Sequence, residues 1–271
     1  MIAIVTDSTV GYSTADIASR GVVRVVPVNY QIGECLFEEG ALDKNGDFLR
    51  RMKGQSVCKT AQPALTEFIR AFRTLTEKGY DVICIVLSSA LSGTWSSARV
   101  AAAQAGGNIR VIDSGTVGYG MHLLVDEAVN MAKAGLAFED VVRHLENLKK
   151  KIGIVFSVES LDRLIAGGRL NNSKAKTTLN LRPVFEQKVK IVFRENARGS
   201  RERLEEMCAL VPASARRLIV CRCGEDTDVS EFTQMLKARF PAVYIHQRVV
   251  GPVLSIHVGE GAFGVAYIAK D

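Results

Sequence analysis

The amino-acid sequence predicts a two-lobed α/β protein, with an N-terminal domain over residues 1–150 and a C-terminal domain over residues 151–271. In the first half, short apolar runs alternate with segments of helical periodicity, which is the pattern of a parallel sheet with crossover helices. In the second half fewer helices separate the apolar runs, which favours an α+β lobe with a mixed or antiparallel sheet. A chain of 271 residues is also long for one hydrophobic core.

The first half should begin with a strand, a helix and a second strand. We expect strands at residues 2–6, 22–30, 82–87 and 109–112, and helices at residues 13–20, 94–105, 121–134 and 138–151. A further helix begins at Leu65, where apolar residues recur with helical spacing, and is closed by Gly79. Residues 31–59 are less regular, so we expect them to leave the sheet.

The second half contains shorter elements. We expect strands at residues 154–158, 218–221, 243–246, 253–258 and 265–269, and helices at residues 161–166, 202–210 and 229–240. Residues 184–193 should form an antiparallel hairpin with Lys188 near its turn.

Small hydroxyl residues follow three of the expected strands in the first half. These segments are residues 7–9 (D-S-T), 88–94 (S-S-A-L-S-G-T) and 113–116 (D-S-G-T), and Thr60 lies in a neighbouring loop before a helix. Ligands of open parallel sheets bind beyond the carboxyl ends of the strands. The sequence therefore predicts a site at this edge that is neutral in sign and rich in hydrogen-bond donors.

The segment Ser92-Gly93-Thr94 lies between a buried strand and a helix start. Backbone N–H groups at a helix N-terminus lack partners and favour anions, and neighbouring hydroxyls can donate further hydrogen bonds. The alternative is that Ser92 only caps the helix, as single serines commonly do. The recurrence of hydroxyl-rich turns favours the anion site.

The formal net charge is +6, and all of the excess lies in the second half, most visibly around Arg194, Arg198, Arg201 and Arg203. These arginines form either a solvated face or a docking surface for an acidic partner. Aromatic residues make up only 7% and do not interleave with a basic stripe, so a regulator that binds nucleic acid is the weakest hypothesis.

Several other classes of protein are disfavoured. The six cysteines include no C-x-x-C pair and the four histidines lack metal-ligand spacing, so we expect reduced thiols, no metal and no cofactor. The chain opens with a strand-like run rather than a signal peptide, and no apolar run approaches the roughly 20 residues of a membrane span. We therefore expect a cytoplasmic protein without an integral membrane segment.

Glycine motifs give no sign of nucleotide binding. Residues 259–264 match the dinucleotide-binding glycine pattern, but they lie too close to the C-terminus to open the required helix. An independent serine hydrolase or acyltransferase that uses Ser92 and His257 remains the alternative function. No third orienting residue stands out, so enzyme activity is the minority hypothesis.

Seven segments occur along the chain in one order: T-D-S-T (residues 6–9), T-A-Q-P (60–63), S-S-A-L-S-G-T (88–94), V-I-D-S (111–114), G-G-R (167–169), R-P-V (182–184) and G-P…H-V-G-E-G-A (251–262). Together they resemble the DegV family over essentially the whole chain. Members of that family are bacterial, two-lobed fatty-acid-binding proteins. Some act as the acyl-carrying subunit of fatty acid kinase, in which a bound fatty acid becomes an acyl phosphate.

The resemblance implies roles for individual residues. Thr60 and Ser92 would hydrogen-bond the fatty-acid carboxyl group, with Gly93, Thr94, Ser114 and His257 near it. Arg169 and Arg198 would contact the partner kinase or the phosphoryl group. The sequence departs from the family pattern at Ala61, Arg182, Val258 and Glu260, whereas Thr60 and Ser92 match it.

We therefore expect a carrier that holds a long-chain fatty acid between its lobes and presents the carboxylate to a fatty acid kinase catalytic subunit. Burying each methylene contributes ~0.8 kcal/mol, so the chain of the lipid would supply most of the affinity. The protein itself should not be a catalyst. Besides the lipid and the kinase, transient contact with a membrane surface is expected, and nucleic-acid binding is not.

Overall fold

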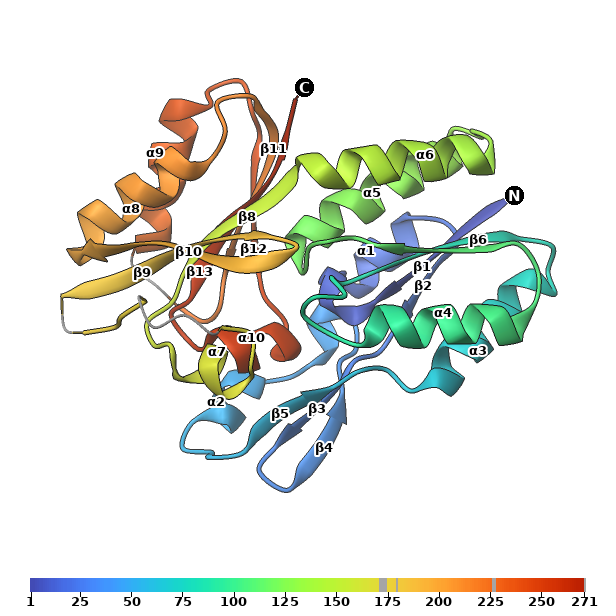
Figure 1. Cartoon of the computed structure of the whole chain (residues 1–271), viewed down its shortest axis with the longest axis horizontal. Helices are drawn as coiled ribbons and strands as arrows, with labels where there is room; N and C mark the ends of the chain where they lie inside the picture. The colour runs from blue at the N-terminus through green and yellow to red at the C-terminus, as the bar shows by residue number, and fades with distance from the viewer. Residues whose placement is uncertain (171–174, 179, 226–227, 271) are drawn as a thin grey trace. The chain divides into compact units, whose positions relative to one another are not determined.

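A computed structural model describes residues 1–170, 175–178, 180–225 and 228–270 (Figure 1). The chain forms two compact units, Met1–Lys150 and Lys151–Asp271. Among the residues described, no helix is both long enough and apolar enough to cross a lipid bilayer.

The N-terminal unit is built on a four-stranded parallel sheet with the strand order β2-β1-β6-β7. Its strands are β1 (Ile2–Asp7), β2 (Val23–Val26), β6 (Asp81–Val86) and β7 (Ile109–Asp113). The central strands β1 and β6 are almost wholly apolar and buried, which is typical of a parallel sheet covered on both faces. The predicted parallel sheet is confirmed.

Helices cover both faces of this sheet (Figure 1). They are α1 (Thr14–Ser19), α3 (Leu65–Thr76), α4 (Thr94–Ala105), α5 (Tyr119–Lys133) and α6 (Phe138–Leu148), with short 3-10 turns η1 (Ser8–Val10) and η3 (Lys149–Lys151). Phe68 and Phe72 of α3 and Ala98 of α4 pack against Val5 and Cys84 of the sheet. Helix α5 lies against β1 and β6, and α6 packs on α5.

A small antiparallel sheet interrupts this layer and has the order β4-β3-β5. Its strands are β3 (Asn29–Ile32), β4 (Cys35–Glu38) and β5 (Cys58–Ala61), with η2 (Leu42–Lys44) and α2 (Phe48–Met52) between the last two. The prediction of one strand over residues 22–30 is wrong, because β2 ends at Val26 and β3 begins at Asn29. Pro27 lies between them, and a proline has no N–H with which to continue a ladder.

The C-terminal unit contains a six-stranded mixed sheet with the order β10-β9-β8-β13-β11-β12. Its strands are β8 (Ile152–Ser157), β9 (Leu181–Lys188), β10 (Lys190–Arg198), β11 (Ala215–Arg222), β12 (Ile245–Val249) and β13 (Phe263–Ala269). Strands β11 and β12 are parallel and the other neighbours are antiparallel. The predicted mixed sheet and the hairpin after Lys188 are confirmed.

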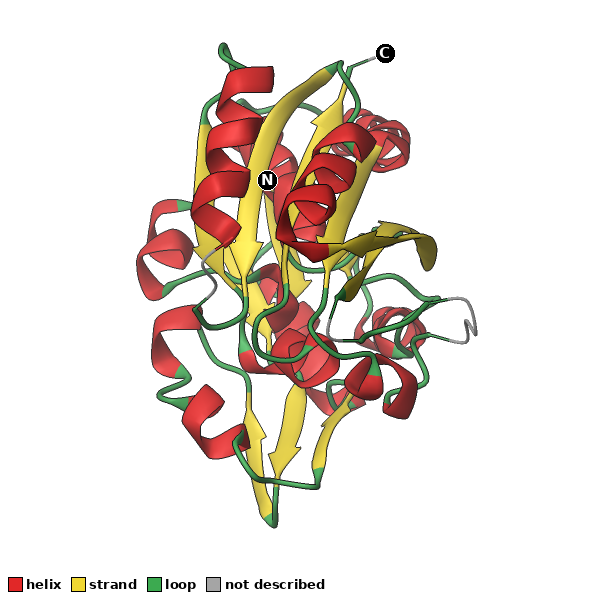
Figure 2. Cartoon of the chain, turned by 90° about the vertical axis from the view of Figure 1, so that its left-hand side faces the viewer, coloured by secondary structure: helices red, strands yellow, loops and turns green. Residues whose placement is uncertain are grey.

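Two helices, α8 (Gly199–Leu210) and α9 (Asp228–Arg239), pack on one face of the mixed sheet. Figure 2 views the chain from their side and shows them in front of the strands. Leu204 of α8 and Phe232 of α9 are fully buried there with Val220 of β11.

Two further helices of this unit, α7 (Asp162–Ala166) and α10 (Pro252–Val258), contact each other. The prediction of a strand over residues 253–258 is wrong. Gly251 is the N-cap and Pro252 occupies the first turn of a helix, where its missing N–H costs nothing. Val253 and Ile256 are buried with helical spacing, which in so short an apolar segment is easily taken for a strand.

Candidate functional site

The carboxyl ends of β1, β6 and β7 lie at one edge of the parallel sheet, where the sequence places the site. The turns that leave β6 and β7 are hydrogen-bonded to each other. The Ser88 amide donates to the Thr116 carbonyl at 2.8 Å, and the Ser89 amide donates to Asp113 Oδ1 at 3.2 Å. The two turns therefore form one connected loop region beyond the sheet.

Ser92, Gly93 and Thr94 form the turn into α4. The Ser92 Oγ lies 2.9 Å from Thr94 Oγ1 and accepts the Thr94 amide at 3.3 Å. Gly93, rather than Ser92, is the N-cap, so no side chain of the cap residue closes the helix. A pair of hydroxyls therefore lies at the amino end of α4, where the helix dipole favours an anion.

Thr60 lies on strand β5, directly across from Tyr30 of β3, and not in a loop as predicted. Two residues later, the Gln62 Nε2 donates to Ser97 Oγ in the first turn of α4 at 2.8 Å. The Gln62 carboxamide also lies over Gly93, since a β carbon added there would be 2.1 Å from Gln62 Oε1. Gln62, which the sequence analysis did not single out, thus joins the end of β5 to the start of α4.

Ser114 is fully buried at the end of β7. Its Oγ donates to the Thr116 carbonyl at 3.0 Å and accepts the Thr116 amide at 3.2 Å. The hydroxyl proton therefore serves the backbone turn, and a role in ligand binding stays a prediction.

A buried carboxyl group, Asp7, lies at the same edge. Its Oδ2 accepts the Leu87 amide at 2.8 Å, and its Oδ1 accepts the amide and the hydroxyl of Thr9 at 3.0 and 2.5 Å. Burial raises the pKa of Asp7 to about 6, against the lowering effect of these hydrogen bonds. The expectation of a neutral edge stays a prediction, and burial of Asp7 favours the uncharged form of its carboxyl group.

The C-terminal unit brings two other predicted residues together, His257 and Arg169. His257 lies in the last turn of α10, and its Nδ1 is 2.7 Å from the position of a β carbon on Gly167, just after α7. An Arg169 Nη1 donates to the Gly167 carbonyl. Burial, and then the positive charge of Arg169, lowers the pKa of His257 to about 4, so the imidazole is neutral at pH 7.

Arg198 lies on different elements, at the corner where β10 ends and α8 begins. Its side chain is exposed, and its amide donates to Glu202 Oε2 at 2.9 Å. Arg182 pairs with Glu159 at 2.5 Å, and Glu159 also binds Arg203.

In the alternative hydrolase pair, Ser92 belongs to the N-terminal unit and His257 to the C-terminal unit. Within its own unit the Ser92 hydroxyl shares a hydrogen bond with Thr94. Across the described ranges, no cluster of three or more His, Cys, Asp or Glu side chains could hold a metal ion. All six cysteines fall in those ranges and are free thiols.

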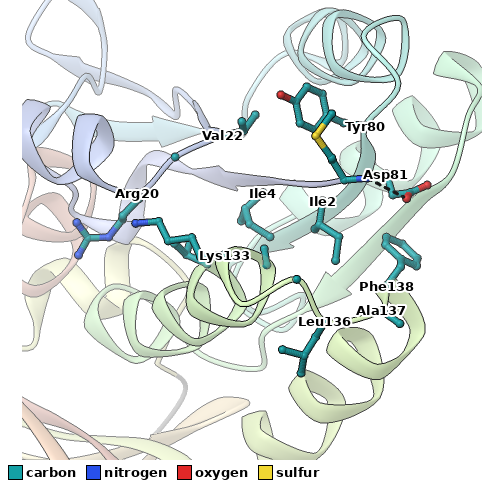
Figure 3. A pocket seen from close by; sticks show the side chains of 15 residues that line it. Ile2, Ile4, Arg20, Val22, Tyr80, Asp81, Lys133, Leu136, Ala137 and Phe138 are labelled. Carbon is teal, nitrogen blue, oxygen red and sulfur yellow. Dashed lines mark ion pairs between the residues drawn. The ribbon is translucent and has the colours of Figure 1, made fainter.

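A pocket of about 560 Å³ lies at the opposite, amino-terminal edge of the parallel sheet (Figure 3). Its lining is mainly apolar and includes Ile2, Leu136 and Phe138. Its charged groups already have partners, since Arg20 pairs with Asp16 and Asp126, Lys133 donates to the Ser19 carbonyl, and Asp81 accepts from Asn108. It holds none of the predicted ligand-binding residues.

Comparisons with known proteins agree with this architecture. The family model described as "Uncharacterised protein, DegV family" matches residues 1–270. The DegV domain-containing protein lin2658 of Listeria innocua is 31% identical over 281 residues, which is 99% of each chain.

Two solved structures have the same fold. A fatty-acid-binding DegV family protein from Thermus thermophilus aligns with a TM-score of 0.87 at 27% identity, covering 99% of each chain. The Fatty Acid Kinase (Fak) B3 protein of Streptococcus pneumoniae, loaded with linoleic acid, aligns with a TM-score of 0.88 over the whole of both chains. Its identity is 23%, so this likeness shows the fold alone. Because the family model spans the chain from end to end, this protein belongs to the DegV family.

Proposed function

We propose that this protein binds a long-chain fatty acid and presents the carboxylate to a separate fatty acid kinase. The hydroxyls of Thr60 and Ser92 hydrogen-bond the carboxylate, with Gly93 and Thr94 beside it. The observation that carries this proposal is the contact of Gln62 with α4, which draws the Thr60 strand to the turn where the hydroxyls of Ser92 and Thr94 lie 2.9 Å apart.

The chemistry of this edge suits one carboxylate group. Hydroxyl and amide donors can satisfy its oxygens, and the dipole of α4 favours its negative charge. The acyl chain supplies most of the affinity through burial in an apolar region, at ~0.8 kcal/mol per methylene. The fatty-acid binding described for the Thermus thermophilus relative supports this class of ligand.

The C-terminal unit contributes the remaining predicted residues. His257 is neutral at pH 7 and can donate a hydrogen bond to the carboxylate without adding charge. Arg169 and Arg198 contact the kinase or the phosphoryl group that the kinase transfers. The kinase catalyses the phosphoryl transfer, and this chain binds and orients the acyl group. It does so in the cytoplasm and contacts a membrane surface transiently when the lipid is exchanged.

Native mass spectrometry with added oleic acid tests the proposal. We expect one lipid per chain, and about tenfold weaker binding for Thr60→Ala and Ser92→Ala, because each removes a hydrogen bond to a charged group. Ser96→Ala, an exposed serine on the same helix, is the matched control and should bind as the wild type does.

Two further assays separate the carrier from the alternatives. A fatty acid kinase supplied with ATP should form acyl phosphate only when this protein is present, and Arg169→Ala should slow that step more than it weakens binding. Turnover of an activated ester by the protein alone, abolished in Ser92→Ala, would contradict the carrier and favour the hydrolase.

A further inference from the structure

Two side chains of the T-D-S-T segment at residues 6–9 form hydrogen bonds to the loops on which the proposed ligand-binding hydroxyls lie. We propose that Asp7 and Ser8 are positioning residues for the fatty-acid carboxylate. Asp7 holds the turn that leads to Ser92, and Ser8 holds the small sheet that carries Thr60. This inference rests on the proposed function and explains how its two hydroxyls are kept in register.

Asp7 connects β1 to the loop after β6, which is 80 residues away in the sequence. The amide and the hydroxyl of Thr9 both donate to Asp7 Oδ1 and so orient the carboxylate, which leaves Oδ2 directed at the Leu87 amide. Leu87 is the first residue beyond β6, and the next residue, Ser88, accepts the Ser92 amide at 3.2 Å. The position of Ser92 is thus set from Asp7 through two hydrogen bonds and one peptide unit.

Ser8 makes the equivalent contact on the other side. Its buried Oγ accepts the Val28 amide at 3.0 Å and donates to Glu39 Oε2 at 2.7 Å. Val28 directly precedes β3 and Glu39 directly follows β4, and the Glu39 amide donates to the Val28 carbonyl at 2.9 Å. Ser8 therefore holds both ends of this hairpin, in which Tyr30 pairs with Thr60 of β5.

Asp7 is the last residue of the buried strand β1 and Ser8 follows it directly, with exposed fractions of 0% and 4%. The rigid end of β1 can therefore fix both loops relative to one point. A hydrogen bond weakens steeply when its distance or angle departs from the optimum. Two hydroxyls that bind one carboxylate thus depend on supporting contacts of this kind.

The protonation state of Asp7 should act on the same contacts. A carboxylate only accepts hydrogen bonds. A protonated Asp7 carries its own hydrogen, which would meet the Thr9 and Leu87 donors and weaken these contacts. The titratable group that faces Asp7 from β6 is Cys84, and burial raises the pKa of that thiol well above its usual value, so it stays neutral. In the part of the chain that the structure describes, the other groups recorded against Asp7 are uncharged: the Thr9 and Leu87 donors and Val26 beside it on β2. From α5, the uncharged Met121 contacts the neighbouring Thr6.

The first test measures the affinity for oleic acid at pH 7.5 and pH 5.5. Asp7→Asn keeps the shape of the side chain but turns an NH₂ group toward the Thr9 or Leu87 donors. We expect about tenfold weaker binding at pH 7.5. At pH 5.5 the ratio of wild-type to variant affinity should fall toward one, and this ratio cancels the titration of the fatty acid itself.

Ser8→Ala should also weaken binding, by about fivefold, and the ratio of wild-type affinity to Ser8→Ala affinity should be the same at both pH values. The matched controls are Asp81→Asn, at the amino end of β6, and Ser19→Ala, which is exposed at the end of α1. Both should bind as the wild type does. Asp7→Asn binding with wild-type affinity at both pH values would overturn the inference while leaving the proposed function intact. A wild-type protein that binds no oleic acid would overturn both.

A second measurement needs no variant and covers the case in which Asp7→Asn fails to fold. The Leu87 amide resonance of the wild type should titrate with a midpoint near pH 6, because its acceptor gains a proton. Saturation with oleic acid should move that midpoint to lower pH, since binding that favours ionised Asp7 must by linkage favour its ionisation. A midpoint that does not move would overturn the inference.

Discussion

Gln62 occupies the space that a side chain on Gly93 would take. A β carbon at residue 93 would lie 2.1 Å from Gln62 Oε1, which is far inside van der Waals contact. The backbone of Gly93 has a φ of −73°, so the glycine is needed for space and not for its conformation. This close approach is what allows Gln62 to reach Ser97 and hold β5 against the start of α4.

Gly93→Ala should therefore displace Gln62 and weaken oleic acid binding about tenfold. Gln62 is exposed, so we expect the free energy of unfolding to change by less than about 1 kcal/mol. Titration of oleic acid and urea unfolding measure the two effects. Gly40→Ala is the matched control, because the nearest atom to its added β carbon is 3.6 Å away. Unchanged affinity in Gly93→Ala would show that Gln62 does not set the site.

Trp95 should report ligand binding directly. It is the one tryptophan of the chain and the second residue of α4, and the Arg99 guanidinium lies 4.8 Å from the centre of its ring. A carboxylate bound at this helix start changes the field around the indole, so its fluorescence should change and saturate at one oleic acid per chain. Ser92→Ala should need about tenfold more lipid for the same change. A change that does not saturate would indicate lipid adsorbed elsewhere.

Asp126 should make the stability of the N-terminal unit sensitive to acid. Burial alone would raise the pKa of this carboxyl group, but hydrogen bonds from His122, Arg20 and Tyr12 outweigh burial and hold the pKa well below its usual value. Asp126→Asn should lower the free energy of unfolding by about 3 kcal/mol at pH 7, because it breaks a buried pair with Arg20.

The sign of the pH effect follows from the lowered pKa. Asp126 contributes its stability above the unfolded pKa of 3.8, and the contribution is lost as the pH falls toward the folded pKa. The difference between Asp126→Asn and the wild type in urea unfolding should therefore shrink below about pH 4. Asp140→Asn, in an exposed pair with Arg143, should show almost no difference at either pH. A constant difference at all pH values would contradict this account.

His257 should remain neutral throughout the physiological range. Its imidazole resonances should titrate with a midpoint near pH 4, because burial and the charge of Arg169 both disfavour the proton. Arg169→Met should raise that midpoint by removing the positive charge. A midpoint near 6.5 in the wild type would mean that the ring is exposed to solvent and could serve as the base that the hydrolase hypothesis requires.

The sequence predicted the elements with long, regular patterns. Helix α4 begins and ends where its pattern indicates, and β1, β6 and β7 end in the hydroxyl turns that mark the candidate site. The pattern was ambiguous where an apolar segment was short. Residues 22–30 read as one strand although Pro27 divides them, and residues 253–258 read as a strand although Gly251 and Pro252 begin a helix.

Contacts between distant segments could not be predicted from local patterns. Gln62 stands before a proline and a helix, which gives no sign that its side chain reaches α4. Asp7 reads as part of a polar turn, and only the register of β1 with β6 shows that it is buried against Leu87. Its raised pKa is a consequence of that burial, so the local sequence pattern could not predict it.

The most direct test of the central claim is native mass spectrometry of the protein as purified from bacteria, with its organic extract analysed for fatty acids. We predict a one-to-one adduct whose mass matches an extracted long-chain fatty acid. Thr60→Ala and Ser92→Ala should carry less of it than Ser96→Ala does. A protein that emerges empty, and stays empty when it is offered long-chain fatty acids, would contradict the account.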